Sequence, residues 1–219
     1  MADSALNVLF VCTANICRSP YAEHRARQLL ADAPIAVASA GVPGFPGHDM
    51  DDAMAEQLRV RGGDPDAHIS RALTSDLVDW ADLVLTFEFA QRMRLLDRWP
   101  SELPKVFGLN QFTEGLQTLS QPQAGTQLVA QVFSAGRPDS MAWDIDDPFR
   151  RGVAAARACA DQIDAALALL VGTLTGGTPP VGVGRVPARA DQRAEPRGFS
   201  QFLARRRPVK ARRALDDRG

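Results

Sequence analysis

The stretch VLFVCTANICRSP, residues 8–20, joins an apolar run to a cysteine, a short loop and an Arg-Ser-Pro sequence. Its apolar start predicts a buried strand over 6–11, and Ser19 and Pro20 are typical of the first turn of a helix. A loop between a strand and a helix directs backbone N–H groups and the positive end of the helix at one point. Such a point binds anions, so we expect an anion site in this loop.

The side chains of the loop indicate phosphoryl chemistry. A thiol at such a position is deprotonated more easily than usual, so Cys12 is predicted to be a thiolate nucleophile near neutral pH. Arg18 can return over the loop and hold two phosphoryl oxygens in its fork. The residues expected to bind phosphate are Thr13, Ala14, Asn15, Ile16, Cys17, Arg18 and Ser19.

Two polar residues are expected to support this loop. The hydroxyl of Ser19 can hydrogen-bond the sulfur of Cys12 and stabilise it as a leaving group. Asn15 suits a left-handed backbone conformation and can tether Ser19 through its side chain.

Strand and helix patterns alternate from residue 6 to 175, which predicts a parallel sheet covered on both faces. The fold class is therefore α/β: three layers, doubly wound, with a four-stranded parallel sheet, helices on both faces and a phosphate-binding loop after the first strand. Expected strands are 6–11, 35–41, 81–87 and 104–109, and expected helices are the one opened by Ser19 and those at 50–63, 88–98 and 151–174.

The segment 111–142 does not fit the alternation. It is expected to hold a short helix around 126–134, flanked by loops. A connection this long in a compact domain is often functional, so we interpret it as an insertion or flap near the site.

The chain divides into one domain, residues 1–175, and a basic tail, residues 176–219. The 219 residues are 45% hydrophobic, enough for a core in a single domain. The tail carries 11 Lys and Arg against 4 Asp and Glu, with repeated Pro and Gly, which predicts disorder. Such a tail can contact an acidic partner or a membrane surface, whereas binding to nucleic acid is not expected.

The compartment is expected to be the cytoplasm. Three cysteines are too few for a secreted disulfide framework, and no zinc-type pair of C-x-x-C spacings is present. The start, MADSALNVLFVC, lacks the pattern of a signal peptide, and the apolar run at 165–174 is too short to span a membrane.

The opening stretch closely resembles the phosphate-binding loop of the low-molecular-weight protein tyrosine phosphatases, and the likeness is to their bacterial members. It continues, in the order of that family, over roughly residues 6–175 and leaves the tail out. The further matching motifs are AE at 22–23, SAG at 39–41, HISR at 68–71, ADLVLTFE at 81–88 and DDPF at 146–149.

The resemblance implies hydrolysis of phosphotyrosine in two steps, with no cofactor and no metal. Cys12 would form a phosphocysteine, and Arg18 with the loop amides would stabilise the phosphoryl oxygens. The acid of the family precedes a proline, which selects Asp147 over Asp144 and Asp146 as the general acid. The crowding of like charges in DIDD also raises the chance that one carboxyl is protonated.

The resemblance assigns further roles around the loop. His68 matches a histidine that supports the Asn15 and Ser19 network from behind, while Arg71 and Glu88 match structural supports. Aromatic side chains at Phe45 and Phe149 are expected to wall the substrate cleft. The implied substrate is a phosphotyrosine protein, with a bacterial tyrosine kinase or a polysaccharide-export component as candidates.

Several alternatives stay open. Arsenate reductases share the fold but need two further cysteines near the third strand, and none lies between 17 and 159. Phosphoarginine phosphatases have a threonine where Ile16 stands, which favours tyrosine here. Cys12 and Cys17 resemble a pair that forms a protective disulfide, although Cys17 can equally be a packing residue. A phosphate-reading interaction module with little turnover is a further hypothesis.

Overall fold

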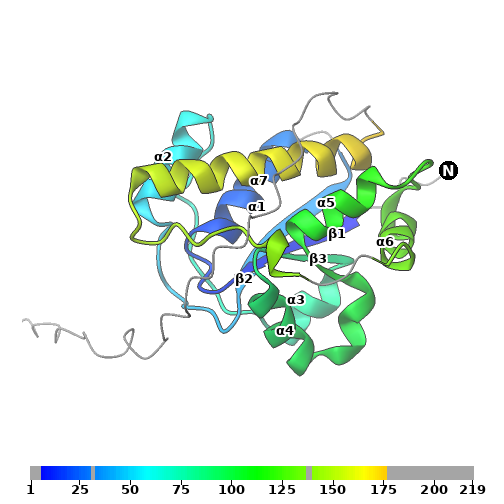
Figure 1. Ribbon diagram of the computed structural model, residues 1–219. Coiled ribbons are helices and arrows are strands. Elements are labelled where there is room, and N and C mark those ends of the chain that lie inside the picture. Colours follow the sequence, from blue (N-terminus) through cyan, green and yellow to red (C-terminus); the bar gives the residue numbers. More distant parts are fainter. Residues whose placement is uncertain (1–5, 31–32, 137–139, 177–219) are drawn as a thin grey trace, which may run out of the picture. The chain divides into compact units, whose positions relative to one another are not determined.

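The fold of this chain is described from a computed structural model, for residues 6–30, 33–136 and 140–176 (Figure 1). The basic tail beyond residue 176 lies outside the described residues. The predicted α/β fold is confirmed, because four parallel strands form one sheet in the order β2-β1-β3-β4. They are β1 (Leu6–Cys12), β2 (Ile35–Gly41), β3 (Leu83–Thr86) and β4 (Val106–Gly108).

Helices cover both faces of the sheet, which makes three layers. Figure 1 shows α1, α5 and α7 on one side of the sheet and α3 and α4 on the other. The bounds of the helices are α1 (Arg18–Leu29), α2 (Asp52–Val60), α3 (Ser75–Trp80), α4 (Phe89–Arg98), α5 (Leu109–Gln117), α6 (Gly125–Ser134) and α7 (Val153–Leu174), with short 3-10 helices η1 (Pro100–Lys105) and η2 (Met141–Trp143).

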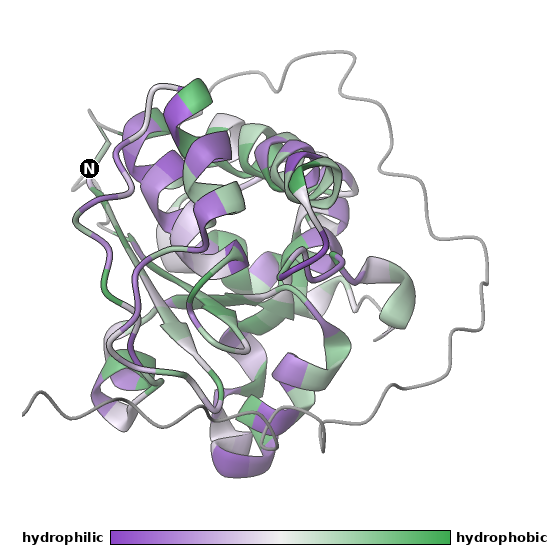
Figure 2. Ribbon diagram, turned by 90° about the vertical axis from the view of Figure 1, so that its left-hand side faces the viewer, coloured by the Kyte–Doolittle hydropathy of each residue, from purple (hydrophilic) through white to green (hydrophobic). Residues whose placement is uncertain are grey.

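The central strand β1 explains the two layers of the core. Val8 and Phe10 pack in the apolar cluster beneath α1 and α7, whereas Leu9 and Val11 pack in the cluster beneath α3 and α4. Successive side chains of a strand point to opposite faces, so an unbroken apolar run fills both cores. Figure 2 shows largely hydrophobic strands in the middle of the fold, surrounded by helices that carry both hydrophobic and hydrophilic residues.

The interpretation of 111–142 as an insertion is wrong at its start. Residues 109–117 form α5, whose Phe112 and Leu116 are buried in the same core cluster as α7. Helix α5 begins directly after β4, without a turn between them, and this hid the boundary in the sequence. The short helix expected around 126–134 is confirmed as α6, which packs on α5 and η1.

Helix α3 was not predicted. It has only six residues, too few to show a helical period, and its start is marked by Thr74, whose hydroxyl accepts from the backbone N–H of Leu77. One residue of α3, Val78, is fully buried against the sheet.

A polar cluster joins three helices on the α7 side. Asp164 of α7 accepts from the hydroxyl of Tyr21 at 3.0 Å and pairs with Arg25 of α1 at 3.1 Å and with Arg61, after α2, at 2.7 Å. Burial and the nearby Asp164 carboxylate raise the pKa of Tyr21 above its ordinary value. The cluster therefore keeps the phenol neutral and fixes α1, α2 and α7 to one another.

No helix among residues 6–30, 33–136 and 140–176 has the length and apolar character needed to cross a membrane.

The place of α5 in the core generates a first prediction. Phe112 has an exposed fraction of 0%, whereas Phe133 of α6 is 41% exposed. Phe112→Ala should lower the free energy of unfolding by about 3–5 kcal/mol, because it leaves a cavity, and Phe133→Ala by less than about 1 kcal/mol. Urea unfolding of both variants measures the difference. Equal, small losses would mean that α5 is a detachable flap after all.

Candidate active site

The loop over 13–17 lies at the carboxyl end of β1, where the sheet topology changes direction. Strand β1 pairs with β2 on one side and with β3 on the other, so the connections after β1 and β3 diverge around a crevice. Ligands of open α/β sheets bind at such a point. The fold therefore sets the predicted anion loop at the place where a ligand is expected.

The sulfur of Cys12 lies at the base of the loop. Its Sγ is 3.0 Å from the hydroxyl of Ser19 and accepts from the backbone N–H of Asn15 at 3.3 Å. The exposed fraction of Cys12 is 2%. The contact with Ser19 was predicted, and either the hydroxyl or the thiol can be its donor, because the hydroxyl of Ser19 also lies 3.2 Å from the carbonyl oxygen of Ala40.

Asn15 fastens the loop to its surroundings. It adopts the predicted left-handed conformation, with φ 60, and its side-chain amide donates to Ser19 at 2.9 Å and to Ser39 of β2 at 2.8 Å. Its Oδ1 accepts from the backbone N–H of Arg71 at 2.9 Å, and its carbonyl lies 2.8 Å from Nε2 of His68. His68 and Arg71 thus support the loop from behind, as expected.

The carbonyl groups of the loop are bonded outward. Thr13 and Ala14 accept from the N–H groups of Gly44 and Phe45 at 3.0 and 3.2 Å, and Ile16 accepts from Asp51 at 3.0 Å. Apart from Asn15, no backbone N–H over 13–17 donates to an acceptor within the described part of the chain. These N–H groups are therefore available to an anion above Cys12.

Close approach of β2 explains the SAG motif. A Cβ at Gly41 would meet the Cα of Gly44 at 2.7 Å and the carbonyl carbon of Ala14 at 2.8 Å. Both are backbone atoms that cannot yield like the end of a side chain, so only glycine fits against the loop here.

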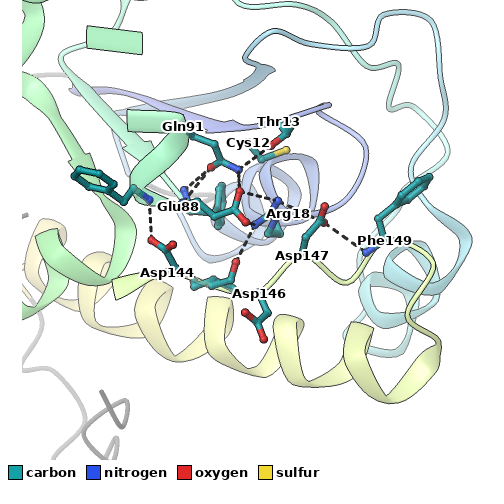
Figure 3. Close-up of polar contacts among 12 residues, drawn as sticks. Cys12, Thr13, Arg18, Glu88, Gln91, Asp144, Asp146, Asp147 and Phe149 are labelled. Atoms are coloured by element: carbon teal, nitrogen blue, oxygen red, sulfur yellow. Dashed lines mark hydrogen bonds and ion pairs between the residues drawn. The ribbon is translucent and has the colours of Figure 1, made fainter. Parts of the chain in front are cut away.

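Arg18 is a buried cation held by two other segments of the chain (Figure 3). Its Nη1 lies 3.1 Å from Glu88 and donates to the carbonyl of Ile145 at 2.8 Å, and its Nη2 lies 3.4 Å from Asp147. Burial opposes its charge, but Asp147 and Glu88 outweigh burial and raise the pKa of Arg18 above its ordinary value. Its Nε is buried and has no hydrogen-bond partner among the described residues.

Gln91 completes the site and was missed in the sequence. Its side-chain amide donates to Glu88 at 2.6 Å and to the hydroxyl of Thr13 at 3.1 Å, so it fixes the carboxylate that holds Arg18 (Figure 3). Its Oε1 accepts from the backbone N–H of Glu88 at 3.1 Å. A glutamine three residues after Glu88, at a helix start, is a capping-box pattern that would have indicated this contact.

The structure separates the three carboxylates of DIDD, which the sequence had treated as one crowded group. Asp144 accepts from the N–H of Phe89 at 2.7 Å, at the start of α4, and Asp146 pairs with Arg151 at 3.7 Å. Asp147 alone of the three lies against Arg18, and Figure 3 shows them pointing in different directions. The expected crowding is therefore wrong, whereas Asp147 does lie at the phosphate loop.

Both predicted cleft aromatics are tied to the site through their backbone. The N–H of Phe45 donates to Ala14 of the loop, and the N–H of Phe149 donates to Oδ1 of Asp147 at 3.4 Å. Phe45 is 43% exposed and stacks on His48 with ring centroids 4.4 Å apart. Phe149 is half-buried against the core.

Cys17 and Cys159 are buried, and no cysteine forms a disulfide. Burial, with Asp51, raises the pKa of Cys17 above its ordinary value, and burial raises the pKa of Cys159 to about 12. The hypothesis of a Cys12–Cys17 disulfide stays a prediction. Over the described ranges, no three His, Cys, Asp or Glu side chains gather as a metal site.

The site brings a cysteine under an anion-binding loop together with a buried arginine and a carboxylate, at the switch point of a parallel sheet. This combination is that of a cysteine-dependent phosphatase. A family model described as low molecular weight phosphotyrosine protein phosphatase matches residues 7–177. The chain belongs to this family.

Three relatives illustrate the range of the family. The chain is 36% identical over 107 residues to a probable low molecular weight protein-tyrosine-phosphatase, EpsP, of Ralstonia nicotianae, covering 49% of this chain and 72% of that protein. It is 32% identical over 135 residues to a protein-arginine-phosphatase of Geobacillus stearothermophilus, covering 60% and 86%. The solved structure of the YwlE arginine phosphatase from that organism superposes with a TM-score of 0.63 and 27% identity, over 78% of this chain and 94% of that one.

The environments of the cysteines lead to a labelling prediction. Thiolates react with iodoacetate and neutral thiols do not, so the raised pKa values of Cys17 and Cys159 should protect both near neutral pH. The native protein should take up one label, on Cys12, and inorganic phosphate should prevent it. Mass spectrometry of peptides locates the label, with the unfolded protein, labelled at all three cysteines, as control. Labelling of Cys17 or Cys159 that phosphate does not change would contradict this assignment.

Proposed function

We propose that the protein is a protein tyrosine phosphatase that works through a phosphocysteine intermediate. The observation that carries the proposal is the set of unused donors around Cys12. Apart from that of Asn15, the loop N–H groups have no acceptor within the described residues, and neither has the buried Nε of Arg18; a phosphoryl group supplies oxygens for them.

In the first step, the thiolate of Cys12 attacks phosphorus, and a sulfur–phosphorus bond forms as the bond to the phenolic oxygen breaks. Arg18 and the loop amides stabilise the charge on the phosphoryl oxygens. Asp147 gives its proton to the departing phenolate.

In the second step, water attacks phosphorus and gives its proton to the Asp147 carboxylate. The sulfur–phosphorus bond breaks, inorganic phosphate leaves, and the thiolate of Cys12 returns. The hydroxyl of Ser19, 3.0 Å from Sγ, stabilises the departing sulfur in this step. No metal or cofactor takes part in the proposed sequence.

Phosphotyrosine is the substrate that the site favours. Cys12 is only 2% exposed, so a phosphate carried on a long, flat ring reaches it more easily than one on the short side chain of serine. Phe45 and Phe149 can flank the ring. EpsP of Ralstonia nicotianae is named a tyrosine phosphatase.

Phosphoarginine is the second candidate substrate, because a 32% identical relative is named a protein-arginine-phosphatase. Ile16, which packs against the core, stands where that branch has threonine. We infer that the apolar side chain favours the apolar ring of tyrosine over a guanidinium.

The proposed partner is a phosphotyrosine protein of the bacterial cytoplasm, with a tyrosine kinase or a polysaccharide-export component as candidates. A contact of the basic tail with an acidic partner or a membrane surface stays a prediction, as does a phosphate-reading role with little turnover.

The function is tested by phosphate release from peptides that carry phosphotyrosine, phosphoserine or phosphoarginine, with and without a chelator. The wild type should release phosphate from phosphotyrosine alone, and chelation should have no effect. Cys12→Ser should lose all measurable turnover while it keeps binding to inorganic phosphate, because the loop donors remain. Phosphate release from the phosphoarginine peptide alone would show that phosphoarginine, and not phosphotyrosine, is the substrate. No release from any peptide by a folded sample would favour the phosphate-reading interaction module.

The acid assignment is tested by leaving-group dependence. Asp147→Asn should lower kcat/KM, which reports the first step alone, by about 100-fold or more for phenyl phosphate, whose leaving group needs a proton, and much less for p-nitrophenyl phosphate. Asp146→Asn is the matched control, and should change neither rate strongly, since Asp146 pairs with Arg151 at the surface. The assignment fails if the control loses rate in the same pattern and Asp147→Asn does not.

A further inference from the structure

Arg150 follows the proposed acid in a strained turn. The N–H of Arg151 donates to the carbonyl of Pro148 at 2.9 Å, and Arg150 has φ 59. Among the described residues, Arg150 and Asn15 are the two non-glycine residues with a positive φ. Backbone strain of this kind persists where the surroundings demand it, and Asn15 already marks the phosphate loop.

The side chain of Arg150 lies over an aromatic wall of the site. Its guanidinium carbon is 5.0 Å from the centroid of the Phe149 ring, a cation–π contact. Phe149 in turn donates its backbone N–H to Asp147. An exposed positive charge is therefore fixed beside the path by which a substrate side chain approaches the acid.

This charge is not neutralised within the described residues. Asp147 is paired with Arg18 at 3.4 Å, and Asp146 with Arg151 at 3.7 Å. Arg150 forms no ion pair with any carboxylate among the described residues. A carboxylate of the substrate can therefore pair with Arg150 without first displacing a carboxylate of the described residues.

The position of Arg150 limits what it can contact. Arg150 is three positions after Asp147 in the sequence, which is at most about 10 Å of extended chain. Asp147 must reach the phenolic oxygen of the substrate, so Arg150 lies near the residues beside the phosphotyrosine. It is not needed for the phosphoryl group itself, whose oxygens have Arg18 and the loop amides.

We propose that Arg150 is a specificity-determining residue that favours substrates with an aspartate or glutamate next to the phosphotyrosine. This inference rests on the proposed tyrosine phosphatase function. It names a substrate class, acidic phosphotyrosine segments.

The test uses short phosphotyrosine peptides that are flanked by Asp, by Ala or by Lys. The wild type should have a KM about three- to fivefold lower for the Asp peptide than for the Ala peptide, the range of one exposed ion pair, with little change in kcat. The Lys peptide should have the highest KM. About 0.5 M salt should remove most of the preference.

Three variants separate charge from backbone effects. Arg150→Gly tolerates the positive φ and removes the charge, so the ratio of the KM for the Ala peptide to the KM for the Asp peptide should fall to about one. Arg150→Lys keeps the charge and should retain most of the ratio. Arg98→Ala is the matched control, because Arg98 stacks over Trp99 at 4.6 Å at the end of α4, and it should keep the full ratio.

The outcomes separate this inference from the function on which it rests. Cys12-dependent hydrolysis of the Ala peptide with no preference for Asp, or with a preference that survives in Arg150→Gly, overturns the role of Arg150 alone. Absence of hydrolysis of every phosphotyrosine peptide by the folded wild type overturns the proposed function, and the inference with it. A preference lost in Arg150→Gly and kept in Arg150→Lys supports both.

Discussion

The guanidinium of Arg18, only 1% exposed, is the charge around which the site is built. A buried cation is costly unless other groups compensate it, and two separate parts of the chain do so. Glu88 comes from the end of β3, and Ile145 and Asp147 come from the segment before α7. Because α1 begins at Arg18, its burial brings the loop after β1, the loop after β3 and the acid segment to one point.

Asn15 fixes the backbone conformation of the loop over 13–17, as Arg18 fixes the positions of the charged groups around it. Its hydrogen bonds to Ser19, Ser39 and Arg71 hold the loop in a shape in which the other backbone amides over 13–17 have no acceptor within the described residues. The donors are thus organised before any anion arrives, so binding does not have to order them. Such preorganisation is what makes electrostatic stabilisation of a transition state effective in our proposed mechanism.

The sequence was most informative where one residue's role depends on its immediate neighbours. Cys12, Arg18 and the left-handed Asn15 follow from a strand, a loop and a helix within one short stretch. Asp147 needed the family resemblance, since spacing alone does not distinguish it from Asp146. The contact of Gln91 with Glu88 follows a local capping-box pattern, but its contact with Thr13 joins distant segments and could not be predicted from the sequence. Helix α5 was missed because β4 meets it without a turn. The stack of Arg150 on Phe149 comes with a positive φ at Arg150, which the residue types in this segment do not predict.

The burial of Tyr21 bears on how this protein relates to the modification it is proposed to remove. It is the sole tyrosine of the chain, its exposed fraction is 0%, and its hydroxyl is engaged by Asp164 inside the α1–α7 contact. A kinase that modifies tyrosine therefore finds no acceptor on the folded surface. If this chain acts together with a tyrosine kinase, it can dephosphorylate the tyrosines that the kinase modifies. The kinase, in turn, cannot regulate the folded phosphatase by phosphorylating it on tyrosine.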